Sequence, residues 1–327
     1  MLIRRSIAGL AALAILAVVA SGQDQKTPVK LEWKFQKGKP FYQELKTETK
    51  QDMKVMGQEV KQSQTQTFYF SWTPTEQDKD KNWIIKQKIE GVKMDIEIGG
   101  NRITYDSTAT GASNNPLKEF FSALVGSEFT LTLDTKKMEV TKVEGREAFL
   151  KSLIGVNAQM EPLLKQILSD EALKQMADPA FAMLPPKDVK VGETWPRKST
   201  LSLGPIGSYE NTYEYKYEGK EKDLDKISVK TTLKYTPPVD PAGGAGTGAL
   251  PFKIKSADLK SKDSKGTIYF DSRPEKGRLD NSKSELTLEG ELTIEIGNMT
   301  SKVELKQTQT TTVKTTDTNP IAPPKKQ

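Results

Sequence analysis

The sequence predicts a mainly β protein with a helical insert. We expect antiparallel, curved sheets that form sandwich or half-barrel lobes, and one alternative is that two such lobes are related to each other. Three observations lead to this prediction: apolar and charged residues alternate along several segments, glycine and asparagine follow these segments, and a central stretch changes to helical spacing. Alternation with period two places apolar side chains on one face of a sheet and charged ones on the other. Strands with one solvated face are typical of antiparallel sheets.

Residues 1–22 are predicted to be a signal peptide. Arg4 and Arg5 precede an apolar run that ends in small residues, and this run is shorter than the roughly 20 residues that a membrane span needs. We place cleavage after Gly22, with Ala20 as the alternative site and an uncleaved anchor as the alternative interpretation. The mature chain is therefore expected to be secreted or periplasmic, with no membrane span.

Residues 23–143 are predicted to form an N-terminal β lobe. Apolar residues alternate with charged ones from Val92 to Ile98, and Gly99 and Gly100 follow. Glycine readily adopts the positive φ angles of tight hairpins, so this pattern indicates a strand that ends in a turn.

Two stretches are predicted to be helical. Within residues 116–125, Phe120 and Phe121 belong to an apolar stripe with helical spacing. Residues 144–178 are predicted to hold further short helices, one of which has Ser169 as its N-cap. These stripes would line a ligand cleft or cover the end of a sheet.

Residues 179–313 are predicted to form a C-terminal β lobe that contains a flexible loop at 236–251, and residues 314–327 are predicted to be a disordered tail. Segments of the two halves echo each other, as in the Gln-Thr repeats at 64–67 and 307–310. Either a duplication or the limited choice of residues in amphipathic strands accounts for these echoes.

The composition excludes several kinds of chemistry. The 327 residues include no cysteine and no histidine, which excludes disulfides, thiolate sites and a Ser-His-Asp triad. No phosphate-binding loop or nucleophile elbow is present, and we expect no catalytic residue, no cofactor and no metal site. The formal net charge of +6 comes from lysines that are interspersed with acidic residues, so we expect no nucleic-acid partner.

Carboxylates leave one catalytic alternative open. Asp106, Asp134 and Asp271 each end an apolar segment, and glycoside hydrolysis needs only two suitably spaced carboxyl groups. Aspartate also commonly begins a turn after a strand. A carboxylate-dependent glycan hydrolase is therefore the second alternative function.

Rows of aromatic residues are the candidate ligand-binding features. Tyrosines occupy alternate positions from 209 to 217, and a similar row runs from 68 to 72. Such rows line apolar cavities or stack on sugars, and they also serve as cross-strand packing. The candidate lining residues are Phe68, Phe70, Trp72, Tyr213, Tyr215, Tyr217, Phe120 and Phe121.

Three motifs carry a resemblance to a protein family. They are Leu31-Glu32-Trp33-Lys34-Phe35 with Gly38 and Tyr42, the pair Asp106-Ser107, and Val191-Gly192-Glu193-Thr194-Trp195. Together they resemble an uncharacterised family of exported bacterial β-rich proteins, a domain of unknown function. The resemblance implies export and β architecture, and it assigns no catalytic or binding residue.

We therefore predict an exported, non-catalytic protein of the bacterial envelope that binds an apolar or amphipathic ligand. The first alternative is a structural or protein-interaction module, because long Thr-, Gln- and Lys-rich strands offer edges to a partner. The expected partner is a lipid or another apolar small molecule, or an envelope protein.

Overall fold

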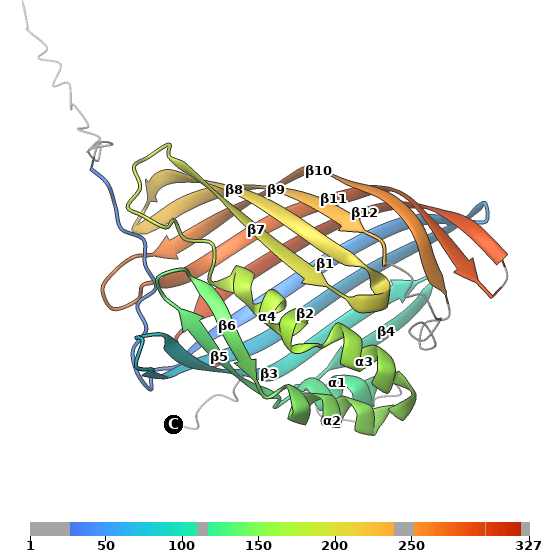
Figure 1. Ribbon diagram of the computed structural model, residues 1–327, viewed down its shortest axis with the longest axis horizontal. Helices are drawn as coiled ribbons and strands as arrows, with labels where there is room; N and C mark the ends of the chain where they lie inside the picture. Colours follow the sequence, from blue (N-terminus) through green and yellow to red (C-terminus); the bar gives the residue numbers. More distant parts are fainter. Residues whose placement is uncertain (1–26, 110–116, 239–251, 298, 322–327) are drawn as a thin grey trace, which may run out of the picture.

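The computed structural model describes residues 27–109, 117–238, 252–297 and 299–321. Within them, twelve strands alternate with a few short helices (Figure 1). The strands are β1 (Phe41–Val55), β2 (Gln58–Gln77), β3 (Trp83–Ile98), β4 (Asn101–Asp106), β5 (Glu128–Asp134), β6 (Glu139–Glu144), β7 (Thr194–Ser202), β8 (Ser208–Glu221), β9 (Leu224–Thr236), β10 (Lys253–Asp271), β11 (Arg278–Ile296) and β12 (Met299–Thr316).

All twelve strands belong to one open, curved sheet in which neighbours pair antiparallel. The order is β6-β5-β3-β2-β1-β12-β11-β10-β9-β8-β7, and β4 pairs with the far part of β3. The mainly β, antiparallel and curved architecture predicted from residue alternation is confirmed.

The first and last strands join the two halves of the chain. β1 pairs with β12 along its length, from Tyr42 opposite Thr316 to Val55 opposite Val303. The segments expected as N- and C-terminal β lobes therefore share one continuous sheet. Besides the Gln-Thr repeats, residues 89–99 and 103–107 are echoed by residues 288–297 and 268–272. The three segments lie mainly in β2, β3 and β4 in the first half and in β12, β11 and β10 in the second, so their order is reversed. Since a tandem duplication keeps its order, strand composition explains these three echoes.

Among the described residues, the helices lie between β6 and β7 in the chain, except for α1, which follows β4, and the 3-10 turn η3, which follows β7. They are α1 (Lys118–Leu124), α2 (Arg146–Val156), α3 (Glu161–Ile167) and α4 (Asp170–Ala177), with 3-10 turns η1 (Ala158–Met160), η2 (Asp178–Ala180) and η3 (Gly204–Ile206). Ser169 caps α4 as predicted, since its side chain accepts a hydrogen bond from the Ala172 N–H at 3.1 Å. In Figure 1, α1, α2 and α3 gather at one side of the sheet, whereas α4 lies across its open front.

Helix α4 and turn η2 connect the two edges of the sheet. The Asp178 carboxylate accepts the backbone N–H of Val140 in β6 at 2.8 Å, and the Gln175 side-chain carbonyl accepts that of Ser202 in β7 at 2.9 Å. Edge strands carry backbone groups without a strand partner. The insert therefore satisfies one N–H on each edge strand while it spans the space between them.

Packed aromatic rings close one end of the concave side. Trp33 lies edge-on to Phe181 at 5.4 Å and to Phe270 at 5.6 Å, and Trp72 stacks on Phe41 at 6.3 Å between ring centroids. All five rings are buried. Because buried aromatic pairs combine a large buried area with favourable edge-to-face geometry, this cluster stabilises the closed end.

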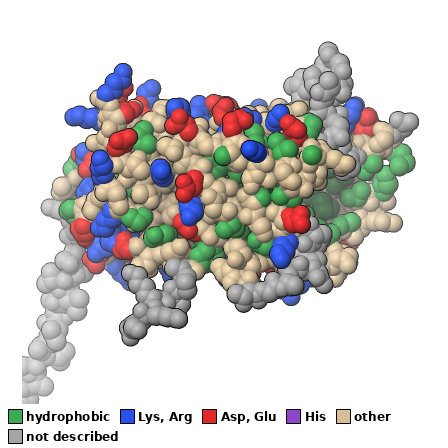
Figure 2. Space-filling model, turned by 90° about the horizontal axis from the view of Figure 1, so that it is seen from below, with side chains coloured by type: hydrophobic (Ala, Val, Ile, Leu, Met, Phe, Trp, Pro, Cys, Tyr) green, Lys and Arg blue, Asp and Glu red, His purple; other side chains and the backbone are tan. Residues whose placement is uncertain are grey.

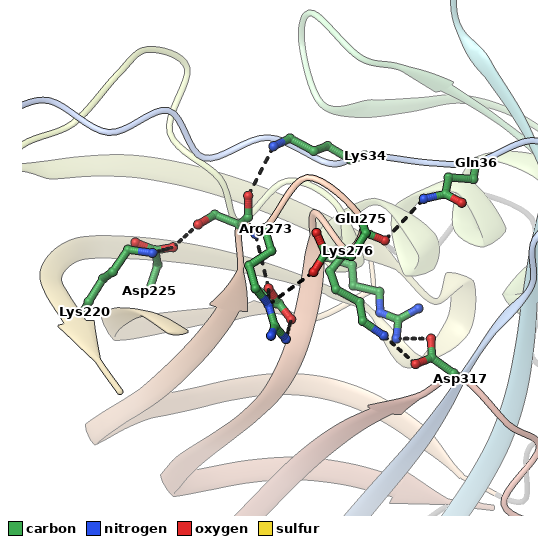
Figure 3. A network of polar contacts seen from close by, with 11 residues as sticks. Lys34, Gln36, Lys220, Asp225, Arg273, Glu275, Lys276 and Asp317 are labelled. Atoms are coloured by element: carbon green, nitrogen blue, oxygen red, sulfur yellow. Dashed lines mark hydrogen bonds and ion pairs between the residues drawn. The ribbon is translucent and has the colours of Figure 1, made fainter. Parts of the chain in front are cut away.

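Polar contacts connect the turns at the same end of the sheet (Figure 3). Asp225 is fully buried, and its carboxylate accepts hydrogen bonds from Tyr217 at 2.7 Å and from Ser272 at 2.5 Å. Asp317, just beyond β12, pairs with Lys276 and with Arg278. These contacts tie the β8–β9 turn, the β10–β11 turn and the C-terminal segment together.

The predicted tail at 314–327 was wrong at its start. Residues 314–316 complete β12, because their backbones pair with β1. Ile321 packs so close to Gly91 in β3 that no larger residue fits there without displacing it. The predicted signal peptide, residues 322–327 and most of the predicted loop at 236–251 lie outside the described residues.

We predict that Trp33→Phe destabilises the fold by about 1 kcal/mol more than Trp72→Phe does. The Trp33 Nε1–H donates to the Phe181 carbonyl at 3.2 Å, whereas the buried Trp72 Nε1 has no hydrogen-bond partner among the described residues. Both substitutions remove the same volume, so their difference isolates the hydrogen bond. Chemical denaturation measures both free energies of unfolding, and equal losses would contradict the assignment.

We predict that Asp317→Asn lowers stability near neutral pH by about 0.2–1 kcal/mol, because the side chain is half-exposed. Hydrogen bonds from Lys276 and Arg278 lower the pKa of Asp317 to about 2. A carboxyl group whose pKa is lower in the folded protein stabilises the fold fully above its ordinary pKa of about 4. This stabilisation is lost as the pH falls toward about 2. Chemical denaturation at a series of pH values should show the difference between wild type and variant shrinking over that window, and a difference that stays constant down to a pH of about 2 would contradict the prediction.

Candidate functional site

The concave side of the sheet holds a cavity of about 810 Å³. Its walls come from strands of both halves of the chain, and α4, η2 and the residues after them cover part of it. The covering residues are Met176, Ala177, Pro179, Ala180 and Met183.

Asp178 lies within this covering segment and is partly buried. Burial raises the pKa of its carboxyl group, and the hydrogen bond from Val140 and the positive charge of Arg197 oppose that shift. Arg197 extends from β7, and its Nη2 donates to the Leu184 carbonyl at 3.2 Å. Asp178 and Arg197 therefore connect the covering segment to β6 and β7. Neither side chain lines the cavity.

One wall of the cavity is aromatic and aliphatic. Tyr213 and Tyr215 stack at 5.8 Å along β8, while Tyr209 meets Tyr235 of β9 at 5.0 Å. Burial raises the pKa of all four hydroxyl groups, that of Tyr235 to about 12. This wall continues with Val229, Leu233, Ile254, Leu259, Leu286, Leu288, Leu292 and Leu305.

The other wall is polar but uncharged. It is formed where β1 and β12 pair at the centre of the sheet, because alternation turns every second side chain of these strands inward. Gln51 donates to Gln307 across the pair at 2.5 Å, and Gln309 donates to Thr311 at 3.4 Å. We call this group the amide stripe; it consists of Gln43, Gln51, Gln307, Gln309 and Thr311.

Charged residues are nearly excluded from the lining. Lys283 and Glu285 are the charged lining residues among those described. Their side chains pair with each other at 2.8 Å and are largely exposed. The inner surface therefore offers aromatic rings, aliphatic groups, amides and hydroxyls, and it offers no buried charge.

The structure brings together half of the aromatic residues that the sequence singled out. Phe70, Trp72, Tyr213 and Tyr215 line the cavity. Phe68 stacks on Phe70 at 5.9 Å but is outside the lining.

The remaining three candidates lie elsewhere. Tyr217 donates to buried Asp225 at the closed end, and burial raises the pKa of its hydroxyl. Phe121 packs against Tyr105 at 5.2 Å, and Phe120 contacts Phe121 at 5.7 Å, so both belong to the core beneath α1.

The amide stripe was not among the predicted lining residues. A signal for it exists in the sequence: glutamine and threonine stand at alternate positions in the first and last strands, where leucine or valine would suit a packed core. Only the pairing of β1 with β12 places these side chains next to each other.

Apolar side chains are exposed at the hairpin end of the sheet, opposite the closed end. Met56, Ile98, Ile296 and Met299 lie in or beside the β1–β2, β3–β4 and β11–β12 turns and are 59%, 41%, 39% and 60% exposed. Figure 2 shows hydrophobic side chains gathered at the corresponding end of the molecule.

The three candidate carboxylates lie on separate turns and outside the cavity lining. Hydrogen bonds hold the pKa of Asp106, Asp134 and Asp271 below the ordinary value, with Lys93 and Arg273 as charged partners of Asp106 and Asp271. None of the three has the raised pKa of a general acid. Among the described residues, no group of three or more acidic side chains has the arrangement of a metal site.

The chain belongs to a family described as "Family of unknown function (DUF6263)", whose model matches residues 80–271. The resemblance to an uncharacterised family is thereby confirmed. Among curated proteins, none matches this chain. Within the described residues, no helix has the length and apolar character needed to cross a membrane.

The solved structures to which the chain is similar include two distant likenesses. A structure titled "Lipid-protein interactions in lipovitellin" is 11% identical with a TM-score of 0.44, and the match covers 90% of this chain but 26% of that one. Pseudomonas aeruginosa OccK5 (OpdH) is 5% identical with a TM-score of 0.23, covering 85% of this chain and 98% of that one. The chain thus spans about a quarter of the lipovitellin chain, and these scores carry no argument about function.

We predict that the cavity tyrosines ionise only as the protein unfolds. Their raised folded-state pKa means that the unfolded chain ionises first, near the ordinary value of about 10, so stability is lost as the pH rises above it. The absorbance of tyrosinate from these four residues and the circular dichroism of the protein should then change over the same pH range. Tyr235→Phe should reduce the alkaline loss, and full ionisation of a folded wild type would contradict the burial.

Proposed function

We propose that this protein is an exported, non-catalytic binding protein of the bacterial envelope that holds an apolar or amphipathic ligand in the concave cavity. The observation that carries the proposal is the cavity of about 810 Å³ with an aromatic and aliphatic wall. Cavities that bind small molecules typically measure about 300–1,000 Å³ and are mainly apolar, with a few polar groups.

The position of the cavity supports the proposal. Packed rings fill the sheet at one end, and exposed apolar side chains lie at the other. An apolar molecule that approached the hairpin end would meet Met56, Ile296 and Met299 before it reached Leu292 and Leu305 in the lining.

The lining also supports a non-catalytic role. Its one carboxylate among the described residues, Glu285, is largely exposed and paired with Lys283. Catalysis by paired carboxylates requires two such groups close to the bound substrate, and the three candidate aspartates lie on separate turns. Export rests on the signal-peptide pattern of residues 1–22.

We expect the protein, expressed with residues 1–22 in a bacterial host and purified without detergent, to carry an extractable apolar molecule. Native mass spectrometry followed by organic extraction detects it. The delipidated protein should also enhance the fluorescence of 1-N-phenylnaphthylamine, an apolar probe. A protein that carries no such molecule and leaves the probe unchanged would overturn the proposal.

A matched pair of variants locates the binding. Thr231→Trp fills the cavity from β9, whereas Lys230→Trp adds the same ring to the opposite, exposed face of the strand. We expect Thr231→Trp to weaken probe binding at least about tenfold, equivalent to about 1.4 kcal/mol, and Lys230→Trp to leave it unchanged. Circular dichroism verifies that both variants are folded, and equal effects would place the probe elsewhere.

A further inference from the structure

We infer that the cavity selects amphiphiles whose polar part is uncharged and rich in hydroxyl or ester oxygens, such as monoacylglycerols, over amphiphiles with a carboxylate or phosphate. This inference rests on the proposed function and specifies its ligand class. It is carried by the amide stripe and by the exclusion of charge from the lining.

Among the described residues, the lining offers a buried anion no cation that is free of an acidic partner. A charge that leaves water needs an opposite charge or several hydrogen bonds, and otherwise its burial is strongly unfavourable. The one lining cation among the described residues, Lys283, is largely exposed and pairs with Glu285 at 2.8 Å. Arg197, near the cover, lies outside the lining and donates to a backbone carbonyl.

The amide stripe has hydrogen-bonding capacity to spare. A glutamine side chain has two N–H donors and an acceptor oxygen. Gln43, Gln51 and Gln309 each donate one bond among the described residues, to Thr315, Gln307 and Thr311. A hydroxyl both donates and accepts, so it can use both parts of an amide, whereas an ionised carboxylate or phosphate would face amide oxygens as well as amide N–H groups.

The arrangement of the two walls matches an amphiphile. Gln51 lies opposite Gln307, and Thr49 opposite Gln309, so inward polar groups occupy successive rows of the β1–β12 pair. On the neighbouring strand, Leu286 and Leu288 lie opposite Gln309 and Gln307 and begin the apolar wall. A neutral head group would lie along the stripe while its acyl chain contacts the leucines and tyrosines of β8–β11.

The test compares two ligands with the same acyl chain. Monooleoylglycerol and oleate, at a pH of about 9 where the fatty acid is ionised, compete with 1-N-phenylnaphthylamine for the delipidated wild-type protein. We expect monooleoylglycerol to bind at least about tenfold more tightly, a difference of about 1.4 kcal/mol. Equal affinity or preference for oleate would overturn the inference while leaving the proposed function intact; absence of probe binding would overturn both.

Variants assign the selectivity to the stripe. The double variant Gln51→Leu/Gln307→Leu should lose about tenfold in affinity for monooleoylglycerol relative to its affinity for the apolar probe, as expected from the loss of about two hydrogen bonds. The control Gln62→Leu/Gln64→Leu changes inward glutamines of β2 that are outside the lining, and its affinity should not change. Equal losses in both double variants would count against the stripe.

A charge inserted into the stripe gives the converse result. Gln51→Lys should reverse the order of affinities, so that oleate binds more tightly than monooleoylglycerol, because an ammonium group would then face the carboxylate. Unchanged selectivity in a folded Gln51→Lys protein would overturn the inference.

Discussion

The pairing of β1 with β12 is the interaction on which the rest of the structure depends. It joins strands that are far apart in the chain along almost their full lengths, from Tyr42 and Thr316 to Val55 and Val303. Without it, the two groups of hairpins would each present an open edge. With it, a single curved sheet results, whose concave side is wide enough to hold a cavity. The amide stripe exists only because these two strands are neighbours.

The cavity persists because the concave side is filled unevenly. At one end, tryptophan and phenylalanine rings pack against one another, and a network around Asp225 and Asp317 fastens the turns outside them. In the middle of β1 and β12, the inward positions carry Thr49 and Gln51 opposite Gln309 and Gln307 instead of large apolar residues. These side chains bond to each other across the strands rather than reaching the opposite wall, and α4 covers the space by bridging the two sheet edges.

The chain belongs to a family without an assigned function, so the function has to be inferred from the residues of the site. The site has the volume and the apolar wall of a ligand cavity, and its uncharged lining restricts the chemistry of what fits. The aspartates considered for catalysis serve as strand ends and ion-pair partners, which is the usual role of aspartate at a turn. The neutral amphiphile that we propose would contact both walls, whereas none of the three candidate aspartates lines either wall.

The sequence by itself determined the strands, the helical insert and the cap of α4, because alternation, helical spacing and an N-cap serine are local signals. It also identified Phe70, Trp72, Tyr213 and Tyr215, since alternation places these rings on one face of each strand. Only the tertiary structure decided that two expected lobes are one sheet, that Tyr217 turns to Asp225, and that residues 314–316 extend β12. Strand pairing between residues about 270 positions apart leaves no mark in local periodicity, and the concave cavity is a consequence of that pairing.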